Sequence, residues 1–168
     1  MYDRIIKSKS RSSAVQLADC ISTLFALELL SPSLKIYLIS PWVSDVPILN
    51  NSYGQFRSIA PEMAKRWIGL SDLLNILAER GSSVHLLTRG NQTQNDSFLR
   101  KLSSHILCKK TDSLHEKGFV THCFYLRGSM NFTYSGINLN DESVELTTDP
   151  TTISQALIEA QNRWTILG

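Results

Sequence analysis

The segment LHEKGFVTHCFYLRGSMNFTYSGINLNDESVEL, residues 114–146, carries the pattern that decides the predicted fold. Two short runs of β-forming residues, Phe119-Val120 and Phe124-Tyr125-Leu126, flank Thr121-His122-Cys123. Runs of this composition around a short polar stretch predict a β-hairpin. We expect the hairpin to be centred near His122, and that centre places His115 directly opposite Ser129.

This register would bring four polar side chains to one face of the sheet. Side chains alternate between the two faces along a strand, and directly opposed residues share a face. A slip of one residue would separate the members of the group, so the prediction depends on the register. The four residues are all odd-numbered: His115, Lys117, Ser129 and Asn131.

An imidazole, an ammonium, a hydroxyl and a carboxamide together offer a nucleophile and several donors, which suit a charged phosphoryl centre. Lys117 would neutralise a non-bridging oxygen, while Ser129 and Asn131 would add neutral donors. Glu142 could accept from the second ring nitrogen of His115 and so set its tautomer. No carboxylate cluster for magnesium or calcium accompanies this face in the sequence, so we expect chemistry without a metal or another cofactor.

The ordered set resembles the HKD signature of the phospholipase D superfamily, which is His-x-Lys, then Gly-Ser-x-Asn, then a carboxylate. The specific match covers roughly the last third of the chain, and the earlier strands LKIYLISPW and SVHLLTR are similar but less diagnostic. The corresponding segments are His115-Glu116-Lys117, Gly128-Ser129-Met130-Asn131 with Phe132-Thr133 after it, and Asn140-Asp141-Glu142.

The resemblance implies a mechanism and an assembly. His115 would attack phosphorus to form a phosphohistidine, a second motif histidine would protonate the leaving group, and water would then release the product. Lys117, Ser129 and Asn131 would bind phosphate, and Glu142 would orient the histidine. The chain holds one motif, as do small nucleases of the superfamily that build the site across a two-fold axis. We therefore expect a homodimer.

One position departs from the family pattern. The superfamily usually has an aspartate where this chain has His122. In the predicted hairpin this position lies in the turn, away from the catalytic face. We therefore expect the change to alter local support rather than to abolish the chemistry.

The remaining sequence predicts a single α/β domain over residues 1–168, which the resemblance specifies as a phospholipase D-like α/β/α sandwich around a central mixed β-sheet. Apolar periodicity and capping residues predict helices over 12–30, 71–80 (capped by Ser71 and ended by Gly81) and 96–103, and a C-terminal helix after Asp149-Pro150. Short apolar runs predict strands over 34–40, 83–88 and 105–109.

Residues 41–69 are the exception, because they are long, irregular and rich in aromatic residues. Two interpretations stay open: a loop on the substrate side, which could stack bases or pack a dimer, or an insertion packed on the domain. Three candidate substrate contacts are Trp42 in this segment, Arg89 after a predicted strand, and Thr133 after the motif. The basic residues, Arg89 included, could equally be scattered solubilising charges.

The motif residues also have structural interpretations. His115 and Lys117 could lie on a solvated strand face, and Ser129 and Asn131 could be turn or cap residues. Glu142 lies in a polar stretch and could be an ordinary surface carboxylate. The ordered spacing of the whole set favours the catalytic interpretation over each of these.

The overall composition of the chain excludes some classes of protein. The net charge of +2 excludes a strongly basic tail, and 42% hydrophobic with 19% charged residues predicts a folded core. Three cysteines without a CxxC pair favour a reducing compartment. We find no signal peptide and no uninterrupted membrane span, and therefore expect a cytoplasmic protein that does not bind membranes.

Three functions compete. The first is a nuclease, with DNA favoured over RNA. The second is a phospholipid or other small phosphodiester hydrolase. The third is a non-catalytic or partner-dependent nucleic-acid-binding subunit. Residues 128–146 also resemble, more loosely, phospholipase D-like proteins of bacterial defence and 7-deazaguanine DNA-modification islands, which implies restriction of foreign DNA together with partner proteins.

Overall fold

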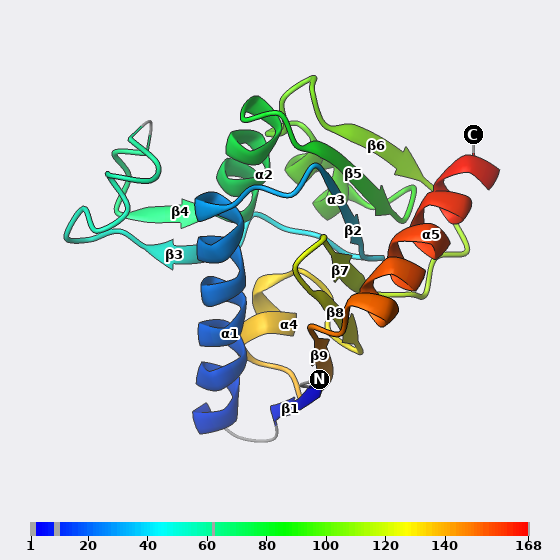
Figure 1. Cartoon of the computed structure of the whole chain (residues 1–168), viewed down its shortest axis with the longest axis horizontal. Helices are drawn as coiled ribbons and strands as arrows, with labels where there is room; N and C mark the ends of the chain where they lie inside the picture. Colours follow the sequence, from blue (N-terminus) through cyan, green and yellow to red (C-terminus); the bar gives the residue numbers. More distant parts are fainter. Residues whose placement is uncertain (1–2, 9–10, 62, 168) are drawn as a thin grey trace.

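The computed structural model describes residues 3–8, 11–61 and 63–167 (Figure 1). Within them, a seven-stranded sheet has the order β1-β9-β8-β7-β2-β5-β6, and β3 and β4 form a second, two-stranded sheet. Strands β2, β5 and β6 run parallel, and the other neighbours run antiparallel. The strands of the large sheet are β1 (Asp3–Ser8), β2 (Lys35–Ile39), β5 (Ser83–Thr88), β6 (Leu107–Lys110), β7 (Gly118–Val120), β8 (Tyr125–Gly128) and β9 (Glu142–Thr147).

Helices cover the two faces of this sheet, as predicted for an α/β/α sandwich. In β2, Ile36 and Leu38 belong to a large core beneath α1, α2, α3 and α4, while Tyr37 and Ile39 belong to a smaller core beneath α5. None of the described helices is long and apolar enough to cross a membrane. The helices are α1 (Arg11–Leu30), α2 (Leu70–Glu79), α3 (Thr93–Leu99), α4 (Tyr134–Asn138) and α5 (Pro150–Ile166).

The α5 layer covers only part of its face. Helix α5 contacts β7 and β8, and its buried alanines pack over the middle of the sheet. On β9 and β1 the same face carries Ser143 and Ile5, which are exposed, and Ile5 keeps 65% of its surface accessible. The sheet therefore has an open face over its antiparallel end, beside α5 (Figure 1).

Local signals predicted several elements correctly. Strand β5 spans the expected residues, and α5 begins with the Asp149 side chain accepting from Thr152 N at 2.9 Å. Helix α2 ends before Gly81, whose φ of 95° glycine adopts without strain. The prediction that Ser71 caps α2 is wrong. Gly69 is the N-cap, and Asp72 accepts from its N–H at 3.1 Å.

The hairpin register differs by one residue from the prediction. Phe119 pairs with Leu126 rather than with Tyr125, because the centre lies between His122 and Cys123. The turn sets this centre: Thr121 N donates to Phe124 O at 3.0 Å, and Thr121 Oγ1 accepts from Cys123 N at 3.1 Å. Odd-numbered residues of the two strands therefore face opposite sides, and a shared strand face does not group the motif residues.

Residues 41–69 are more regular than predicted. They contain β3 (Pro47–Asn50) and β4 (Trp67–Gly69), an antiparallel pair that we call the β3–β4 arm together with the connecting residues (Figure 1). The buried side chain of Asn51 holds this connection, because its Nδ2 donates to Met63 O and Lys65 O, each at 3.1 Å. Strand β3 contacts α1, so the arm is packed on the domain.

A single carboxamide joins the carboxyl ends of β2 and β5. Asn95, on α3, has no exposed surface, and its Oδ1 accepts from Val43 N at 2.9 Å. Its Nδ2 donates to Pro41 O at 2.8 Å, to Thr88 Oγ1 at 2.9 Å and to Arg89 O at 3.0 Å. The segments that leave both strands are therefore tied to one buried side chain.

Removing this amide should destabilise the protein. In Asn95→Ala, the buried Val43 N would lose its hydrogen-bond partner, and Pro41 O would keep only its bonds from Arg89 N and Thr88 Oγ1, so we expect the free energy of unfolding to fall by about 2 kcal/mol. Urea unfolding should show a lower midpoint with an unchanged slope. Gln94→Ala changes an exposed neighbour on the same helix and should stay within about 0.5 kcal/mol of wild type. Equal stability of the two variants would contradict this role.

His85 lies between the sheet and α5. Its ring stacks on Tyr37 at 4.5 Å between centroids and meets the Trp164 ring edge-on at 4.9 Å. Burial lowers the pKa of His85 below its ordinary value of 6.5, and the nearby ammonium groups of Lys35 and Lys109 lower it further. The packing of α5 on this part of the sheet therefore favours a neutral imidazole.

This environment predicts a loss of stability in mild acid. The unfolded chain binds a proton at His85 near its ordinary pKa, and the folded chain binds it only at lower pH. The contribution of His85 is thus complete above pH 6.5 and is lost as the pH falls towards the lowered pKa. Between about pH 8 and about pH 5, His85→Phe should lose less unfolding free energy than wild type. Identical pH profiles would refute the assignment.

Candidate active site

The motif residues lie just beyond the strands of the hairpin. Strand β7 begins at Gly118, after His115 and Lys117, and β8 ends at Gly128, before Ser129 and Asn131. The two segments stay connected, because Gly128 N donates to Lys117 O at 3.4 Å. Loop geometry, rather than strand alternation, positions the motif side chains in three small groups.

The first group surrounds His115. Arg89 Nη2 donates to Leu114 O at 2.6 Å and lies 3.4 Å from His115 Nδ1. Lys117 Nζ donates to the backbone oxygen of His115 at 2.8 Å. Leu114 is buried in the core beneath α5 and anchors the segment that carries the exposed His115. Two cations therefore lie beside one histidine.

The contact with Arg89 has chemical consequences. A guanidinium only donates hydrogen bonds, so in this arrangement His115 Nδ1 accepts and the ring hydrogen of the neutral imidazole lies on Nε2. Arg89 Nε is buried and has no hydrogen-bond partner within the described part of the chain. The Nη2 end of the guanidinium places a positive charge beside His115, where it suits an anion.

The second group joins Ser129 to Glu142. Ser129 Oγ donates to the carboxylate of Glu142, which is 8% exposed, and accepts from Ser143 N at 3.0 Å. Asn140 Nδ2 donates to the same carboxylate at 3.4 Å. Gly128 is required here, because its φ is 154° and a Cβ would lie 2.1 Å from Ser143 O. The close approach of β8 and β9 sets the position of Ser129.

The third group places Asn131 beside Trp42. Asn131 Oδ1 accepts from Trp42 N at 3.4 Å. Ser40 Oγ donates to Trp42 O at 2.7 Å and accepts from Phe132 N at 3.1 Å. An isolated parallel bridge joins Val43 to Phe132. The motif turn is therefore held against the segment that follows β2.

Helix α4 fixes the backbone of this turn from behind. Thr133 is 9% exposed, and its Oγ1 accepts from Gly136 N at 3.1 Å as the N-cap of α4. A Cβ on Gly136 would lie 2.2 Å from Asn131 O, so the helix packs directly on the turn. Thr133 has a clear capping role, and its contact with substrate stays a prediction.

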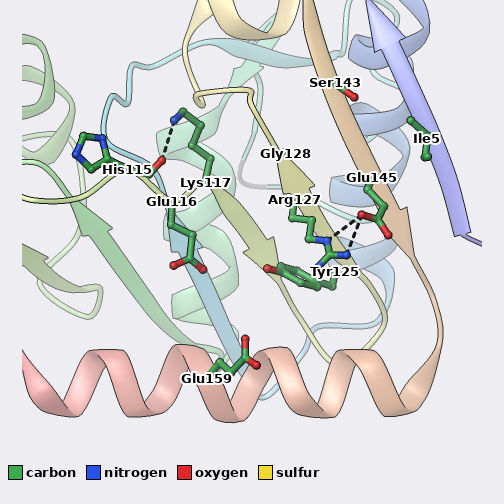
Figure 2. A pocket seen from close by; sticks show the side chains of 10 residues that line it. All are labelled: Ile5, His115, Glu116, Lys117, Tyr125, Arg127, Gly128, Ser143, Glu145 and Glu159. Atoms are coloured by element: carbon green, nitrogen blue, oxygen red, sulfur yellow. Dashed lines mark hydrogen bonds and ion pairs between the residues drawn. The ribbon is translucent and has the colours of Figure 1, made fainter.

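A hollow of about 540 Å³ adjoins the first group. Figure 2 shows His115 and Lys117 on one side of it, the Arg127–Glu145 pair in the wall formed by β8 and β9, and Glu159 on α5. Arg127 Nη2 and Glu145 Oε2 are 2.9 Å apart. This hollow opens onto the uncovered face of the sheet, whereas Ser129, Asn131 and Glu142 are not among its lining residues.

Sequence analysis missed two supporting contacts. Asn95 connects the backbone of Arg89 to the segment of Trp42, and nothing in its polar surroundings distinguishes it in the sequence. Glu116, between the two motif residues, pairs with Arg163 of α5 at 2.5 Å. The contact ties the His115 segment to the last helix. Only the tertiary arrangement brings these partners together.

His122 lies in the hairpin turn, at the end of β7 away from Lys117. Its N–H donates to Ser33 Oγ at 3.3 Å, and Ser33 Oγ donates to the buried carboxylate of Glu28 at 3.0 Å. The departure from the family pattern therefore lies next to a structural contact between the turn and the end of α1.

Comparisons with known proteins agree with this arrangement. No curated protein sequence matches the chain. Among solved structures, Nuc from Salmonella typhimurium, a phospholipase D family member, is similar with a TM-score of 0.64 at 16% identity, covering 98% of this chain and 94% of Nuc. NucT from Helicobacter pylori gives 0.61 at 14% identity, covering 96% and 94%. Polyphosphate kinase from Porphyromonas gingivalis gives 0.59 at 13% identity, covering 99% of this chain and 26% of the kinase.

These structural similarities show the fold, and the match to a family model shows the family. Residues 47–164 match the family described as "Cardiolipin synthase, PLD-like domain". The match covers most of the chain and includes every motif residue, so the resemblance inferred from the hairpin segment is confirmed. This chain belongs to the phospholipase D-like domain family.

Proposed function

We propose that this protein is a phosphodiesterase, and more specifically a metal-independent nuclease that acts through a phosphohistidine on His115. The observation that carries the proposal is the pair of cations at His115, with Arg89 Nη2 3.4 Å from the ring and Lys117 Nζ 2.8 Å from the backbone oxygen of His115. A phosphate oxygen is the anion that this chemistry would bind beside a nucleophile. Family membership and the fold of Nuc support the reaction class.

The reaction would proceed in two balanced steps. His115 Nε2 attacks phosphorus, so an N–P bond forms, the P–O bond to the leaving group breaks, and a second histidine protonates the leaving oxygen. The second histidine then takes a proton from water, the water oxygen attacks phosphorus, and the N–P bond breaks. Lys117 and Asn131 would bind the non-bridging oxygens through these steps.

A nucleophilic Nε2 needs the ring hydrogen on Nδ1. Arg89 faces Nδ1 in the described arrangement, so we expect substrate to take over the guanidinium and the imidazole to rotate. Glu142 would then accept from Nδ1, as its position in the motif implies. Its carboxylate already receives hydrogen bonds from Ser129 and Asn140, which would keep it oriented.

The second histidine would be His115 of another copy. A C2 dimer presents the same surface twice, so residues near the axis meet their own copies. The open face beside α5 supports this assembly, because it leaves Ile5 65% exposed and borders the hollow that His115 lines. Packing two such faces together would bury that apolar surface and bring the two His115 segments towards one site.

The biological role is proposed from the looser resemblance of residues 128–146. It supports a cytoplasmic protein that cuts foreign DNA, together with partner proteins, in a bacterial defence or DNA-modification system. The competing role is a partner-dependent subunit that binds nucleic acid without cutting it. A phospholipid substrate is the third alternative, and the same cleavage assay separates all three.

Loss of the nucleophile should abolish cleavage. We expect wild type to cleave labelled single- or double-stranded DNA, or RNA, in excess EDTA, and His115→Ala to be slower by at least about 10³-fold. His105→Ala removes an exposed histidine outside the site and should retain activity. Cleavage of phospholipid vesicles alone would overturn the nuclease assignment, and no cleavage of any substrate would favour the binding subunit.

A shared site predicts how mixed dimers behave. If each reaction needs both histidines, equal amounts of wild type and His115→Ala, after subunit exchange, should keep about a quarter of the wild-type activity, because only wild-type homodimers react. Independent sites would leave about half. Sedimentation in the same buffer would show whether dimers form, and a monomer that is fully active would contradict the assembly.

A further inference from the structure

A second hollow lies on the opposite side of the sheet from α5. It has a volume of about 600 Å³ and lies between α1, the β3–β4 arm and α4. We call it the arm groove, and Figure 1 shows the arm standing beside α1. Three aromatic rings line it: Phe56 and Trp67 from the arm and Tyr134 from α4. Trp67 is 47% exposed and Tyr134 is 52% exposed, so both rings are available to a ligand.

Carboxamides complete the lining. Asn50 and Asn138 both border the arm groove. Asn50 Oδ1 accepts from Ser52, and Asn138 Nδ2 donates to Tyr134 O at 3.2 Å. The opposite ends of the two amides, Asn50 Nδ2 and Asn138 Oδ1, have no hydrogen-bond partner among the described residues. One free donor and one free acceptor beside aromatic rings match the needs of a nucleobase, which has a flat face and a polar edge.

Basic residues flank the two arm rings in the sequence, although none of them lines the arm groove itself. Arg57 follows Phe56 in the chain and Lys65-Arg66 precedes Trp67, and all three basic side chains are exposed. Lys65 pairs with Asp72 at 2.7 Å, and the lining itself includes one carboxylate, Asp19. Basic side chains interleaved with exposed rings are the pattern of single-strand binding surfaces.

The arm groove is also continuous with the motif turn. Tyr134 follows the turn of Asn131 directly, and its N–H donates to Ser44 Oγ at 3.4 Å. The segment that begins with Trp42, beside Asn131, leads into β3. Two short stretches of chain therefore run from the candidate active site to the arm groove, and a flexible strand could follow the same path.

We propose that the arm groove binds unpaired bases of a single-stranded nucleic acid whose backbone reaches the His115 site. The proposal rests on the proposed nuclease function and names its substrate class. Rings such as Trp67 stack only on bases whose faces are free, and a duplex keeps its bases paired and stacked. Substrates with unpaired stretches are therefore preferred over blunt duplexes.

The test measures binding separately from cleavage. In a His115→Ala background, which cannot cut, fluorescence anisotropy follows a fluorescein-labelled single-stranded DNA of about 12 nucleotides. Adding Trp67→Ala should weaken its affinity at least about fivefold, and Trp67→Phe should restore most of it. Tyr53→Ala removes an exposed ring on the same arm that does not line the groove, and it should leave the affinity within about twofold.

A blunt duplex of the same sequence should bind more weakly and be insensitive to Trp67→Ala. Unchanged single-strand affinity in Trp67→Ala, or an equal loss for the duplex, would overturn the proposal. Far-ultraviolet circular dichroism confirms that each variant is folded. If wild type cleaves nothing while binding still depends on Trp67, the arm groove stands and the nuclease assignment falls. If wild type cleaves nucleic acid but binding does not depend on Trp67, the nuclease assignment stands and the proposed role of the arm groove is wrong.

Discussion

The buried carboxamide of Asn95 connects the two groups of the candidate site that contain Arg89 and Trp42. It joins the backbone after β2 to the backbone after β5, and both segments lead to motif residues. Arg89 reaches the His115 segment from one of them, and Trp42 holds Asn131 from the other. A fully satisfied amide in a dry interior tolerates little displacement, since any shift leaves a buried polar group without a partner. Asn95 thus restricts the positions of both Arg89 and Trp42, which are far apart in the sequence.

Uneven coverage of the sheet gives its two faces different surfaces. The face under α1 and α4 is closed by the large core and carries the arm groove at its margin. The other face is covered by α5 only over its middle, which leaves an open area next to His115. An apolar residue such as Ile5 on an open sheet face gains by burial against a partner. The proposed dimer and the proposed base-binding groove therefore use opposite layers and do not compete for surface.

Two glycines hold the backbone of the motif segment in place. Gly128, which belongs to the motif, lets β8 approach the backbone of β9, and Gly136, which lies beyond it, lets α4 pack on the turn of Asn131. A methyl group at either position would displace the backbone that carries Ser129 or Asn131. His122, which departs from the family pattern, lies at the other end of the hairpin, where its N–H donates to Ser33 Oγ. The other motif residues, from His115 to Glu142, match the family pattern.

The class of fold, the motif residues and the elements with strong local signals, such as β5 and the Asp149 cap of α5, could be predicted from the amino-acid sequence. Apolar periodicity, capping and motif order depend on residues close together in the chain, so they are readable without coordinates. The hairpin register, the pairing of β1 with β9, and the contacts of Asn95 and Arg89 became visible only in the three-dimensional arrangement. A turn hydrogen bond at Thr121 sets the register, and the other contacts join residues far apart in sequence, whose energies depend on packing that no local pattern encodes.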